Sequence, residues 1–398
     1  MAINQVKCLQ VKPIRNLLKK IKPNFEKEGK LEKFYPVYNA FETFFFVPGE
    51  TTPSAGAHIR DAIDLKRTMI LVVLSLVPCL LFGMWNVGYQ HYRALGITDA
   101  SLLNNFIFGV KKVFPIVIVS YVSGLGTEFI FAIIRKHTIN EGFLVSGMLI
   151  PLVMPVDIPL WMVAVATIFA VIIGKEVFGG TGMNVLNPAL TARAFLFFAY
   201  PSKMSGNEVW INTDATKGQQ VVDGFSGATP LGDAAAGFAD KIPGFWESFI
   251  GTIPGSIGET STIACLIGAA VLLYTGIGSW RIMLSVFIGG LVMSSIFYAV
   301  GANTLMQISP LHHLVLGGFA FGAVFMATDP VTAAQTNTGK YIYGFLIGMF
   351  AILIRVFNPA YPEGMMLAIL FMNVMAPLID HYVVRANISR RLKRVKTR

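Results

Sequence analysis

Thr229 is the residue of this sequence with the most evident chemistry, because it lies among small residues and directly precedes a proline. It ends the stretch Asp223-Gly224-Phe225-Ser226-Gly227-Ala228-Thr229. A threonine hydroxyl can attack a pyrophosphate, and small neighbours let an enzyme active site close around it. Taken alone, however, the stretch is better explained as a structural turn.

The elements that position this threonine are membrane spans, as the composition indicates. The chain has 398 residues, of which 54% are hydrophobic and only 14% are charged, whereas soluble domains carry about 25% charged residues. The mean hydropathy is +0.61. These values exclude a disordered, fibrous or ordinary soluble globular protein and indicate a chain that crosses the membrane several times.

Positive charge is concentrated near the two ends of the sequence. Basic segments beside hydrophobic spans stay cytoplasmic, so both ends are predicted to lie inside and the number of crossings is even. Nucleic-acid binding is the competing explanation of a basic tail, but this tail adjoins a hydrophobic span, and we expect no nucleic-acid partner. We also expect no cleavable signal peptide, because the first residues are polar. The basic residues are Lys7, Lys12, Arg15, Lys19, Lys20, Lys22, Lys27, Lys30 and Lys33, and Arg385, Arg390, Arg391, Lys393, Arg394, Lys396 and Arg398.

Apolar runs predict about ten membrane-spanning helices, given that a crossing needs about 20 residues. Several runs are short and interrupted by Gly or Pro. Such broken helices survive in a bilayer only where the freed backbone lines a buried site or cavity. The charges of the loops fit this topology except for Arg355, which falls near an outer end. The predicted spans are 68–88, 113–134, 142–156, 158–174, 187–200, 261–276, 281–301, 314–327, 341–356 and 363–383.

Two short segments resemble each other in the two halves of the chain. Asn187-Pro188-Ala189-Leu190-Thr191-Ala192 and Asp329-Pro330-Val331-Thr332-Ala333 each follow a glycine-rich stretch. We predict that they lie at matching places in two repeats of five spans, and the second repeat must be inverted because five is odd. Such folds bind their ligands between the repeats. The alternative is that an Asn-Pro or Asp-Pro pair only marks the start of a helix.

The predicted organisation has five parts: a basic cytoplasmic segment (1–67), a first five-helix repeat (68–200), an outer loop with Thr229 (201–260), a second repeat (261–383) and a basic tail (384–398). Cys8, Cys79 and Cys265 are too widely spaced for a disulfide framework or a metal-ligand pattern. The histidines show no zinc-binding spacing. We therefore predict no metal cluster.

The stretch that ends at Thr229 resembles the flavinylation motif D-x-x-[ST]-G-A-T, at which a flavin transferase attaches FMN through a phosphoester. With the ten spans, Gly174-Lys175-Glu176-Val177-Phe178-Gly179-Gly180-Thr181-Gly182, Asn184 and Asn187-Pro188-Ala189, the whole chain is similar to the B subunits of sodium-translocating NADH:quinone reductases. The D subunits of Rnf ferredoxin:NAD oxidoreductases share the fold and the flavin threonine. The long basic N-terminal segment, with Phe34-Tyr35-Pro36-Val37-Tyr38 and Phe44-Phe45-Phe46, favours the quinone-reducing family.

The resemblance implies two flavins, a covalent FMN near the outer face and a non-covalent riboflavin nearer the inner face. Riboflavin is expected at Asn184 and Asn187, because carboxamides can hydrogen-bond the edge of the ring and glycines let the backbone approach it. Without the resemblance, two asparagines that cap a broken helix would be the preferred explanation. The expected FMN site consists of Thr229 as the modified residue, with Asp223, Ser226, Gly227 and Ala228.

The resemblance also implies a quinone site near the inner face. A quinone head needs a flat apolar slot with a polar end, which aromatic side chains beside a carboxylate provide. Each Phe taken singly is better explained as a lipid-facing or core residue. Relatives often have an aromatic residue in place of Leu144 and a glycine in place of Leu125, which puts the shape of the slot in doubt. The expected residues are Gly124, Ile139, Glu141, Gly142, Phe143, Leu144, Phe195 and Phe197.

Three acidic residues are candidates for a sodium pathway, because Na⁺ needs oxygen ligands and an acidic side chain within a span is costly. They are Glu128, Asp329 and Asp380, all predicted toward the inner side. For Asp329 and Asp380 the alternative is a residue at a helix end that pairs with an arginine or with backbone groups.

The function implied is that of a membrane flavoprotein subunit of a bacterial inner-membrane complex with subunits A, C, D, E and F. Electrons from NADH would pass from FMN through riboflavin to ubiquinone or menaquinone, coupled to outward Na⁺ transport, and the chain would be inactive alone. The alternatives are an Rnf-type D subunit and an inverted-repeat transporter without a redox role. A stand-alone NADH oxidase is disfavoured, because there is no GxGxxG after a plausible strand and no cysteine set for an iron–sulfur cluster.

Overall fold

The computed structural model describes residues 12–26, 29, 31–45, 65–97, 99–135, 142–206, 209–213, 227–359 and 361–396. Within these ranges the secondary structure is helical and contains no strand. This confirms the predicted all-helical membrane fold. Each of the ten predicted spans has a helical counterpart, but only six helices of the described ranges are long and apolar enough to cross a membrane on their own.

The helices form two halves with similar order and contacts. The first half is α3 (Leu65–Ala94), α4 (Leu102–Arg135), α5 (Phe143–Leu152), α6 (Leu160–Gly174) and α7 (Pro188–Ala199). The second half is α11 (Thr262–Tyr274), α12 (Trp280–Val300), α13 (Pro310–Val315) with α14 (Phe319–Phe321) and a π-helical turn (Gly322–Met326), α15 (Asn337–Phe357) and α16 (Met365–Lys396).

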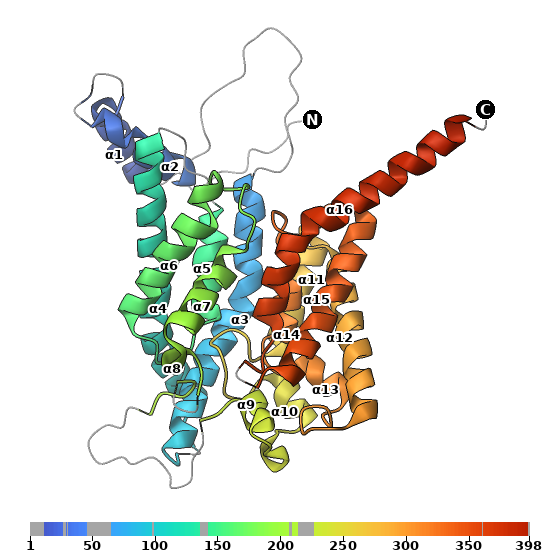
Figure 1. The fold of residues 1–398 in the computed structure, drawn as a ribbon. Helices are drawn as coiled ribbons and strands as arrows, with labels where there is room; N and C mark the ends of the chain where they lie inside the picture. The colour runs from blue at the N-terminus through green and yellow to red at the C-terminus, as the bar shows by residue number, and fades with distance from the viewer. Residues whose placement is uncertain are drawn as a thin grey trace, which may run out of the picture.

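Equivalent helices pack in equivalent ways in the two halves. In the first half α4 packs on α6 and α6 on α7, and in the second half α12 packs on α15 and α15 on α16. Across the halves, the two first helices (α3 and α11) pack together, and so do the two last ones (α7 and α16). α3 begins at the end of the molecule where α11 finishes (Figure 1), as expected for an inverted repeat.

The two ends of the molecule differ in what they carry. At one end, here called the basic side, lie α1 (Lys12–Ile21), α2 (Tyr35–Phe45) and the C-terminal end of α16 (Figure 1). At the other end, the Thr229 side, lie α9 (Pro230–Ala235) and α10 (Phe245–Ile250). The short helix α8 (Pro201–Met204) follows α7 directly.

Glycines bring neighbouring helices into close contact. A Cβ atom on Gly109 of α4 would lie 1.6 Å from the carbonyl oxygen of Met84 in α3. A Cβ atom on Gly348 of α15 would lie 2.0 Å from the carbonyl oxygen of Val286 in α12. Lipid offers no hydrophobic driving force for helix association, so such close backbone packing is a main source of attraction between membrane helices.

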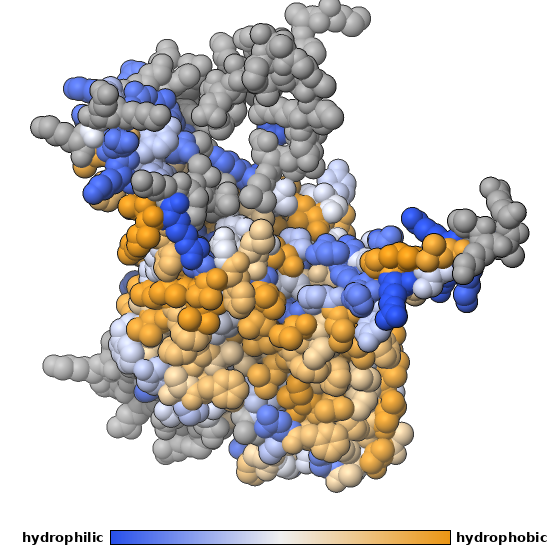
Figure 2. Space-filling view, turned by 45° about the horizontal axis from the view of Figure 1, so that its top comes forward, coloured by the Kyte–Doolittle hydropathy of each residue, from blue (hydrophilic) through white to orange (hydrophobic). Residues whose placement is uncertain are grey.

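The lateral surface is apolar, as a membrane-spanning protein requires. On α12, Leu284, Ile288, Val292 and Ile296 are exposed at intervals of four residues, which places them on one face of the helix. Figure 2 shows hydrophobic side chains over the body of the molecule and hydrophilic ones on the protruding end of α16. In water this surface would cost free energy, whereas lipid covers it without penalty.

Three of the predicted boundaries were wrong. α4 begins at Leu102 and not at 113, because its first turns carry polar residues that mask the apolar run; α16 continues to Lys396. The span predicted at 314–327 is divided into α13, α14 and the π-helical turn.

The side chain of Arg355 explains how this break in the helix is tolerated. Its guanidinium is fully buried and donates to the carbonyl oxygens of His313 (2.7 Å) and Leu316 (3.1 Å). The broken helix leaves these two oxygens without a backbone partner among the described residues.

The predicted equivalence of the Asn-Pro and Asp-Pro segments was also wrong. Asn187 begins the fifth helix of its half, whereas Asp329 follows the third membrane segment of the other half. The sequence similarity therefore does not mark equivalent positions.

Two cysteines that are far apart in the sequence lie close together in the fold. The sulfur atoms of Cys79 in α3 and Cys265 in α11 lie 3.9 Å apart, and both residues are buried free thiols.

Candidate functional site

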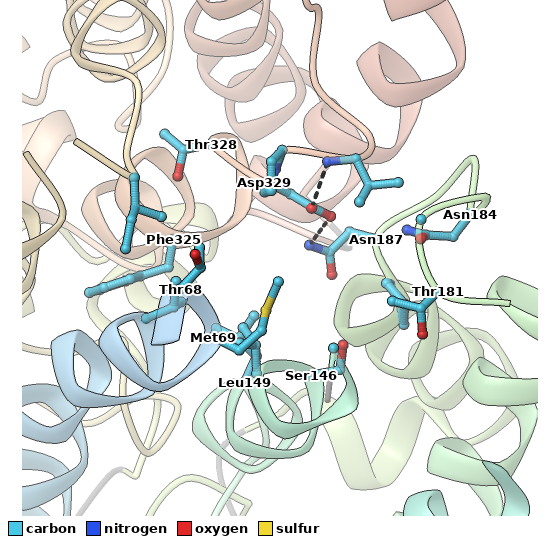
Figure 3. A pocket seen from close by; sticks show the side chains of 18 of the residues that line it. Thr68, Met69, Ser146, Leu149, Thr181, Asn184, Asn187, Phe325, Thr328 and Asp329 are labelled. Atoms are coloured by element: carbon cyan, nitrogen blue, oxygen red, sulfur yellow. Dashed lines mark hydrogen bonds between the residues drawn. The ribbon is translucent and has the colours of Figure 1, made fainter. Parts of the chain in front are cut away.

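A cavity of about 110 Å³ lies between the two halves, toward the basic side. Figure 3 shows the side chains of Asn187 and Asp329 next to each other on one wall, with Met69 and Leu149 on the opposite wall. Its walls come from α3, α5, the glycine-rich segment before α7 and the segment after the π-helical turn. The labelled lining residues are Thr68, Met69, Ser146, Leu149, Thr181, Asn184, Asn187, Phe325, Thr328 and Asp329.

Asn187 both caps a helix and joins the two halves. Its Oδ1 accepts hydrogen bonds from the backbone N–H groups of Ala189 (3.0 Å) and Leu190 (3.3 Å), which makes it the N-cap of α7. Its Nδ2 donates to Oδ2 of Asp329 at 3.3 Å (Figure 3). The helix-cap explanation is thus correct for Asn187, but the same side chain also lines the cavity.

Asn184 lines the cavity without capping a helix. Its Nδ2 donates to the carbonyl oxygen of Leu186 at 3.1 Å, within the same loop. Among the residues that the structure describes, nothing donates to its Oδ1, so this oxygen can accept from a ligand. Gly179, Gly180 and Gly182 have φ values of +120°, +98° and +90°, so this loop follows a path that favours glycine.

A buried ion pair adjoins the cavity. Nζ of Lys175 donates to Oε1 of Glu128, and both side chains are only 5% exposed. Lys175 also lines the cavity, so the lysine lies between the cavity and the carboxylate. As arranged, the charge of Glu128 is compensated by a lysine, and its Oε1 is occupied by that contact.

The other two sodium candidates lie in different surroundings. The carboxylate of Asp329 accepts from Asn187, from the Val331 N–H (3.1 Å) and from the Thr332 hydroxyl (3.1 Å). The carboxylate of Asp380 accepts from the N–H groups of Gln335 (2.6 Å) and Thr336 (3.0 Å), ahead of α15. Asp380 therefore satisfies backbone groups at a helix end, as the alternative explanation proposed.

The residues expected at the quinone site fall into two groups. Phe143 is fully buried against Gly124, where an added Cβ would lie 1.8 Å from the ring, and Gly142 lines the cavity. The Leu144 carbonyl accepts from Tyr121 (2.7 Å). Phe195 stacks on Phe169 (4.4 Å between centroids), and Phe197 packs on Tyr361 (4.6 Å). Both follow the start of α7 by about two turns or more, which separates their contacts from those of Phe143. Ile139 and Glu141 lie outside the described residues.

Thr229 borders a small hollow on the opposite side of the molecule. It is the N-cap of α9, and its hydroxyl oxygen accepts from the Gly232 N–H at 3.1 Å. Gly227 and Ala228 precede it as buried residues, whereas Asp223 and Ser226 lie outside the described residues. The hollow is lined by Thr229, Pro230, Leu231, Ile253, Pro254, Gly255, Ser256, Glu259, Thr260, Gly317, Gly318 and Glu363.

Buried charges form the floor of this hollow. Nη1 of Arg193, in α7, lies 2.7 and 2.9 Å from the two carboxylate oxygens of Glu259, and Nη2 lies 2.7 Å from Oε2 of Glu363. Nη2 also donates to the Ser256 hydroxyl at 3.2 Å. We call Arg193, Glu259 and Glu363 the charge triad. It connects α7 of the first half with the segment that precedes α16 in the second half.

The sequence analysis missed Lys175 and the charge triad as site residues. Arg193 and Arg355 each interrupt an apolar helix, and the cost of an ionisable residue within a span was a signal that could have found them. Glu259 and Glu363 lie in polar segments, where an acidic residue is ordinary. Only the fold shows that they share one guanidinium.

Comparison with known proteins identifies the relatives of this chain. The sequence profile of the NQR2, RnfD, RnfE family matches residues 52–389. The B subunit of the Na⁺-translocating NADH-quinone reductase from Ectopseudomonas mendocina is 51% identical, over 96% of this chain and 99% of its own length. The proteins of the same name from Chromohalobacter salexigens and Pseudomonas aeruginosa are 50% and 49% identical over 96% of this chain, and these matches span 96% and 99% of their lengths.

Proposed function

Because the chain belongs to the NQR2, RnfD, RnfE family, we propose that it is the B subunit of a bacterial Na⁺-translocating NADH:quinone reductase. Its curated relatives carry this name over nearly their whole length. In this function the chain is a multi-pass inner-membrane subunit that works only together with the other subunits of a six-subunit complex. The basic side lies in the cytoplasm, since positively charged segments are retained there.

We place covalent FMN on Thr229, and the hollow supports this assignment. The residue fits the group chemically: its hydroxyl oxygen borders a recess and is half-buried, so it is reachable yet held in position. Gly318 leaves no room for a side chain, because an added Cβ would lie 2.8 Å from the Glu259 carboxyl group. This glycine keeps the recess open. A flavin transferase would act on the chain before this site closes.

We place riboflavin in the cavity at Asn184 and Asn187. The free Oδ1 of Asn184 offers an acceptor for the N–H of a flavin ring, and the apolar walls at Met69 and Leu149 suit the ring faces. Flavins accept and release electrons one at a time, which lets them connect a two-electron donor to further carriers. The chain's own contribution is to hold the two sites near opposite faces, so that electron transfer between them crosses the membrane dielectric.

Quinone reduction and sodium transport complete the proposed function. Gly142, directly ahead of α5, lines the cavity, and Phe143 packs behind it against Gly124, which supports quinone binding near the basic side. Asp329 supplies carboxylate oxygen in the cavity for a sodium pathway, and Asp380 and Glu128 remain candidates for it. An electron that moves inward carries charge in the same electrical sense as a cation that moves outward. The two movements can therefore be coupled.

The main support for the proposed function is that Thr229 lies beside a hollow in a chain of this family. Substitution of Thr229 tests whether this residue carries the flavin. We expect Thr229→Ala to abolish in-gel flavin fluorescence of this chain and quinone-dependent NADH oxidation by the purified complex. The matched control is Thr260→Ala, which removes another hydroxyl of the same hollow and should leave the fluorescence intact. Fluorescence that survives in Thr229→Ala refutes the assignment.

Two further measurements separate the alternatives. Mass spectrometry of the peptide with Thr229 should show an added FMN mass, and a bare peptide from an active complex would favour a transporter without redox function. Quinone-dependent NADH oxidation by the whole complex distinguishes the proposed function from that of an Rnf-type subunit, which works between ferredoxin and NAD.

A further inference from the structure

The carboxylates of the charge triad face a hollow. An ion pair that only holds two segments of the chain together would not require this position. Glu259 and Glu363 both line the recess at Thr229, while Arg193 lies behind them. Any charge that appears on a group attached to Thr229 therefore acts first on two carboxylates. In surroundings of low polarity such charges interact strongly, because water does not screen them.

The charges around Glu259 are balanced as long as no further charge enters. Arg193 approaches from α7, Glu363 and Tyr361 from the segment before α16, and Arg355 from α15, where it interacts electrostatically with Glu363. Cys265 of α11 is a further titratable neighbour. Two guanidinium groups oppose two carboxylates. A phosphoester on Thr229 would add one negative charge and an added electron a second, and each of these charges raises the affinity of the carboxylates for a proton.

A second observation points to proton binding at the same place. The hydroxyl of Tyr361 is buried, the residue is 5% exposed, and among the described residues the hydroxyl has no hydrogen-bond partner. It interacts electrostatically with Arg193 and with both carboxylates. Burial raises the pKa of Tyr361, so its O–H stays protonated. A hydroxyl of this kind can donate to a neighbouring oxygen whose protonation state changes.

We propose, on the premise that Thr229 carries a flavin, that Glu259 is a proton-accepting site coupled to its reduction. When the group on Thr229 gains an electron that originates from NADH, the Glu259 carboxylate takes up a proton from water on the Thr229 side. An O–H bond forms on Glu259, and the local charge is unchanged. When the electron leaves, the proton returns to the same water. Glu259 therefore compensates charge without transporting protons across the membrane.

The geometry selects Glu259 rather than Glu363 as the acceptor. The Glu259 side chain is 6% exposed and that of Glu363 is 10% exposed. Glu363 interacts with the guanidinium groups of both Arg193 and Arg355, whereas within the described residues the ion pair of Glu259 is with Arg193, so the charge of Glu259 is the less compensated of the two. Burial raises the pKa of Glu259, Arg193 lowers it, and the negative charge of Glu363 raises it further.

Infrared difference spectroscopy of the purified complex, reduced minus oxidised, tests the proposal. We expect a carboxylic-acid C=O band on reduction that shifts in D₂O, is lost in Glu259→Gln and persists in the control Glu247→Gln, which removes an exposed carboxylate of the Thr229 side outside the hollow. The band should also be lost in Thr229→Val, which removes the coupling flavin. Absence of the band from the unmodified complex, or its persistence in Glu259→Gln, overturns the proposal.

Redox titration gives a second, independent readout. The midpoint potential of the flavin on Thr229 should fall as pH rises in the unmodified complex, because reduction takes up a proton. In Glu259→Gln it should fall less steeply with pH, because the amide takes up no proton and only the protonation of the flavin ring itself remains. An equal slope in the two preparations refutes the proposal. If Glu259→Gln does not assemble, Glu259→Asp keeps a carboxyl group but moves it, so the infrared band should shift. An unshifted band refutes the proposal.

These measurements distinguish a failure of the role proposed for Glu259 from a failure of the proposed function of the whole chain. The mass of the Thr229 peptide is measured for each preparation. A peptide without flavin in the active, unmodified complex refutes the proposed function and this proposal together. A loaded peptide without the infrared band, or with a pH-independent potential, refutes only the role of Glu259.

Discussion

The cavity at Asn187 and the hollow at Thr229 both depend on α7, but they are held together differently. In the cavity, the carboxylate of Asp329 is bound by neutral donors, namely an amide, a hydroxyl and a backbone N–H. In the hollow, two carboxylates are bound by one guanidinium. The first arrangement can be altered one hydrogen bond at a time, whereas in the second the loss of one group leaves buried charges without a partner.

This difference predicts where the molecule tolerates change. A neutral hydrogen bond contributes about 0.5–1.5 kcal/mol, but removing one partner of a buried ion pair costs about 3–5 kcal/mol. The Thr229 side should therefore be rigid and sensitive to the loss of charge, while the cavity should adapt more readily to a ligand. The following substitutions test this contrast.

The largest effect is expected for Arg193→Met. The substitution leaves Glu259 and Glu363 buried without their shared guanidinium, and we expect the free energy of unfolding to fall by at least about 3–5 kcal/mol. Thermal unfolding of the purified complex measures this loss. The triple variant Arg193→Met, Glu259→Gln, Glu363→Gln should recover part of it, because no charge is then left unpaired. An unchanged unfolding temperature in Arg193→Met would contradict the expectation that the Thr229 side is more sensitive to the loss of a charge than the cavity.

Lys175→Met should have the next largest effect. It leaves the single carboxylate of Glu128 without its partner, at a cost of about 3 kcal/mol, and it also changes the cavity wall. Combining it with Glu128→Gln gives a double-mutant cycle, in which the coupling energy of the pair is measured directly. Strictly additive effects would show that the pair contributes no coupling energy.

Asn187→Ala should have a moderate effect on stability and a clear one on cofactor content. Loss of the α7 cap costs about 1 kcal/mol, and we expect the complex to lose riboflavin, measured by chromatography of extracted flavins. Covalent flavin on Thr229 should be unaffected. The matched variant is Asn184→Ala, which removes a carboxamide without a cap and should lose riboflavin at unchanged stability. Full riboflavin content in both variants would reject the cavity as its site.

Asp380→Asn should have the smallest effect on stability. The amide keeps one of the oxygens that receive the N–H groups of Gln335 and Thr336, so we expect a loss below about 1 kcal/mol. If Asp380 belongs to the sodium pathway, the Na⁺ concentration for half-maximal turnover should rise. The control is Asp240→Asn on the Thr229 side. An unchanged sodium requirement would leave Asp380 with its helix-end role alone.

Much of the fold followed from the sequence because membrane insertion depends on local composition. Apolar runs of fixed length and the basic ends located ten helical segments, and most boundaries were close to those observed. The errors came from local exceptions: polar residues in the first turns of α4 hid its start, and the break between α13 and α14 is made possible by a distant arginine. An arginine 42 residues further along the chain leaves no local signal at the break.

The candidate sites followed only partly from the sequence. Thr229 and the two asparagines were recognisable because their motifs are local and resemble those of a family. The charge triad was not, since Arg193 is separated from Glu259 and Glu363 by 66 and 170 residues along the chain. The phenylalanines of α7 were assigned to the same slot as Phe143 from the resemblance, but in the structure Phe195 stacks on Phe169 and Phe197 packs on Tyr361.

The sequence by itself therefore determined that this protein is a helical membrane protein, and it singled out Thr229 as a candidate for modification, because hydrophobic length, charge and motif are properties of contiguous residues. The tertiary structure alone decided which charges meet. It paired Lys175 with Glu128, set Asn187 against Asp329 and placed two carboxylates on one guanidinium beside Thr229. The physical reason is that buried charges and amides must find partners wherever the fold brings them. In this inverted repeat the partner lies in the same half for Lys175 and in the other half for Asn187 and for the Arg193–Glu363 pair.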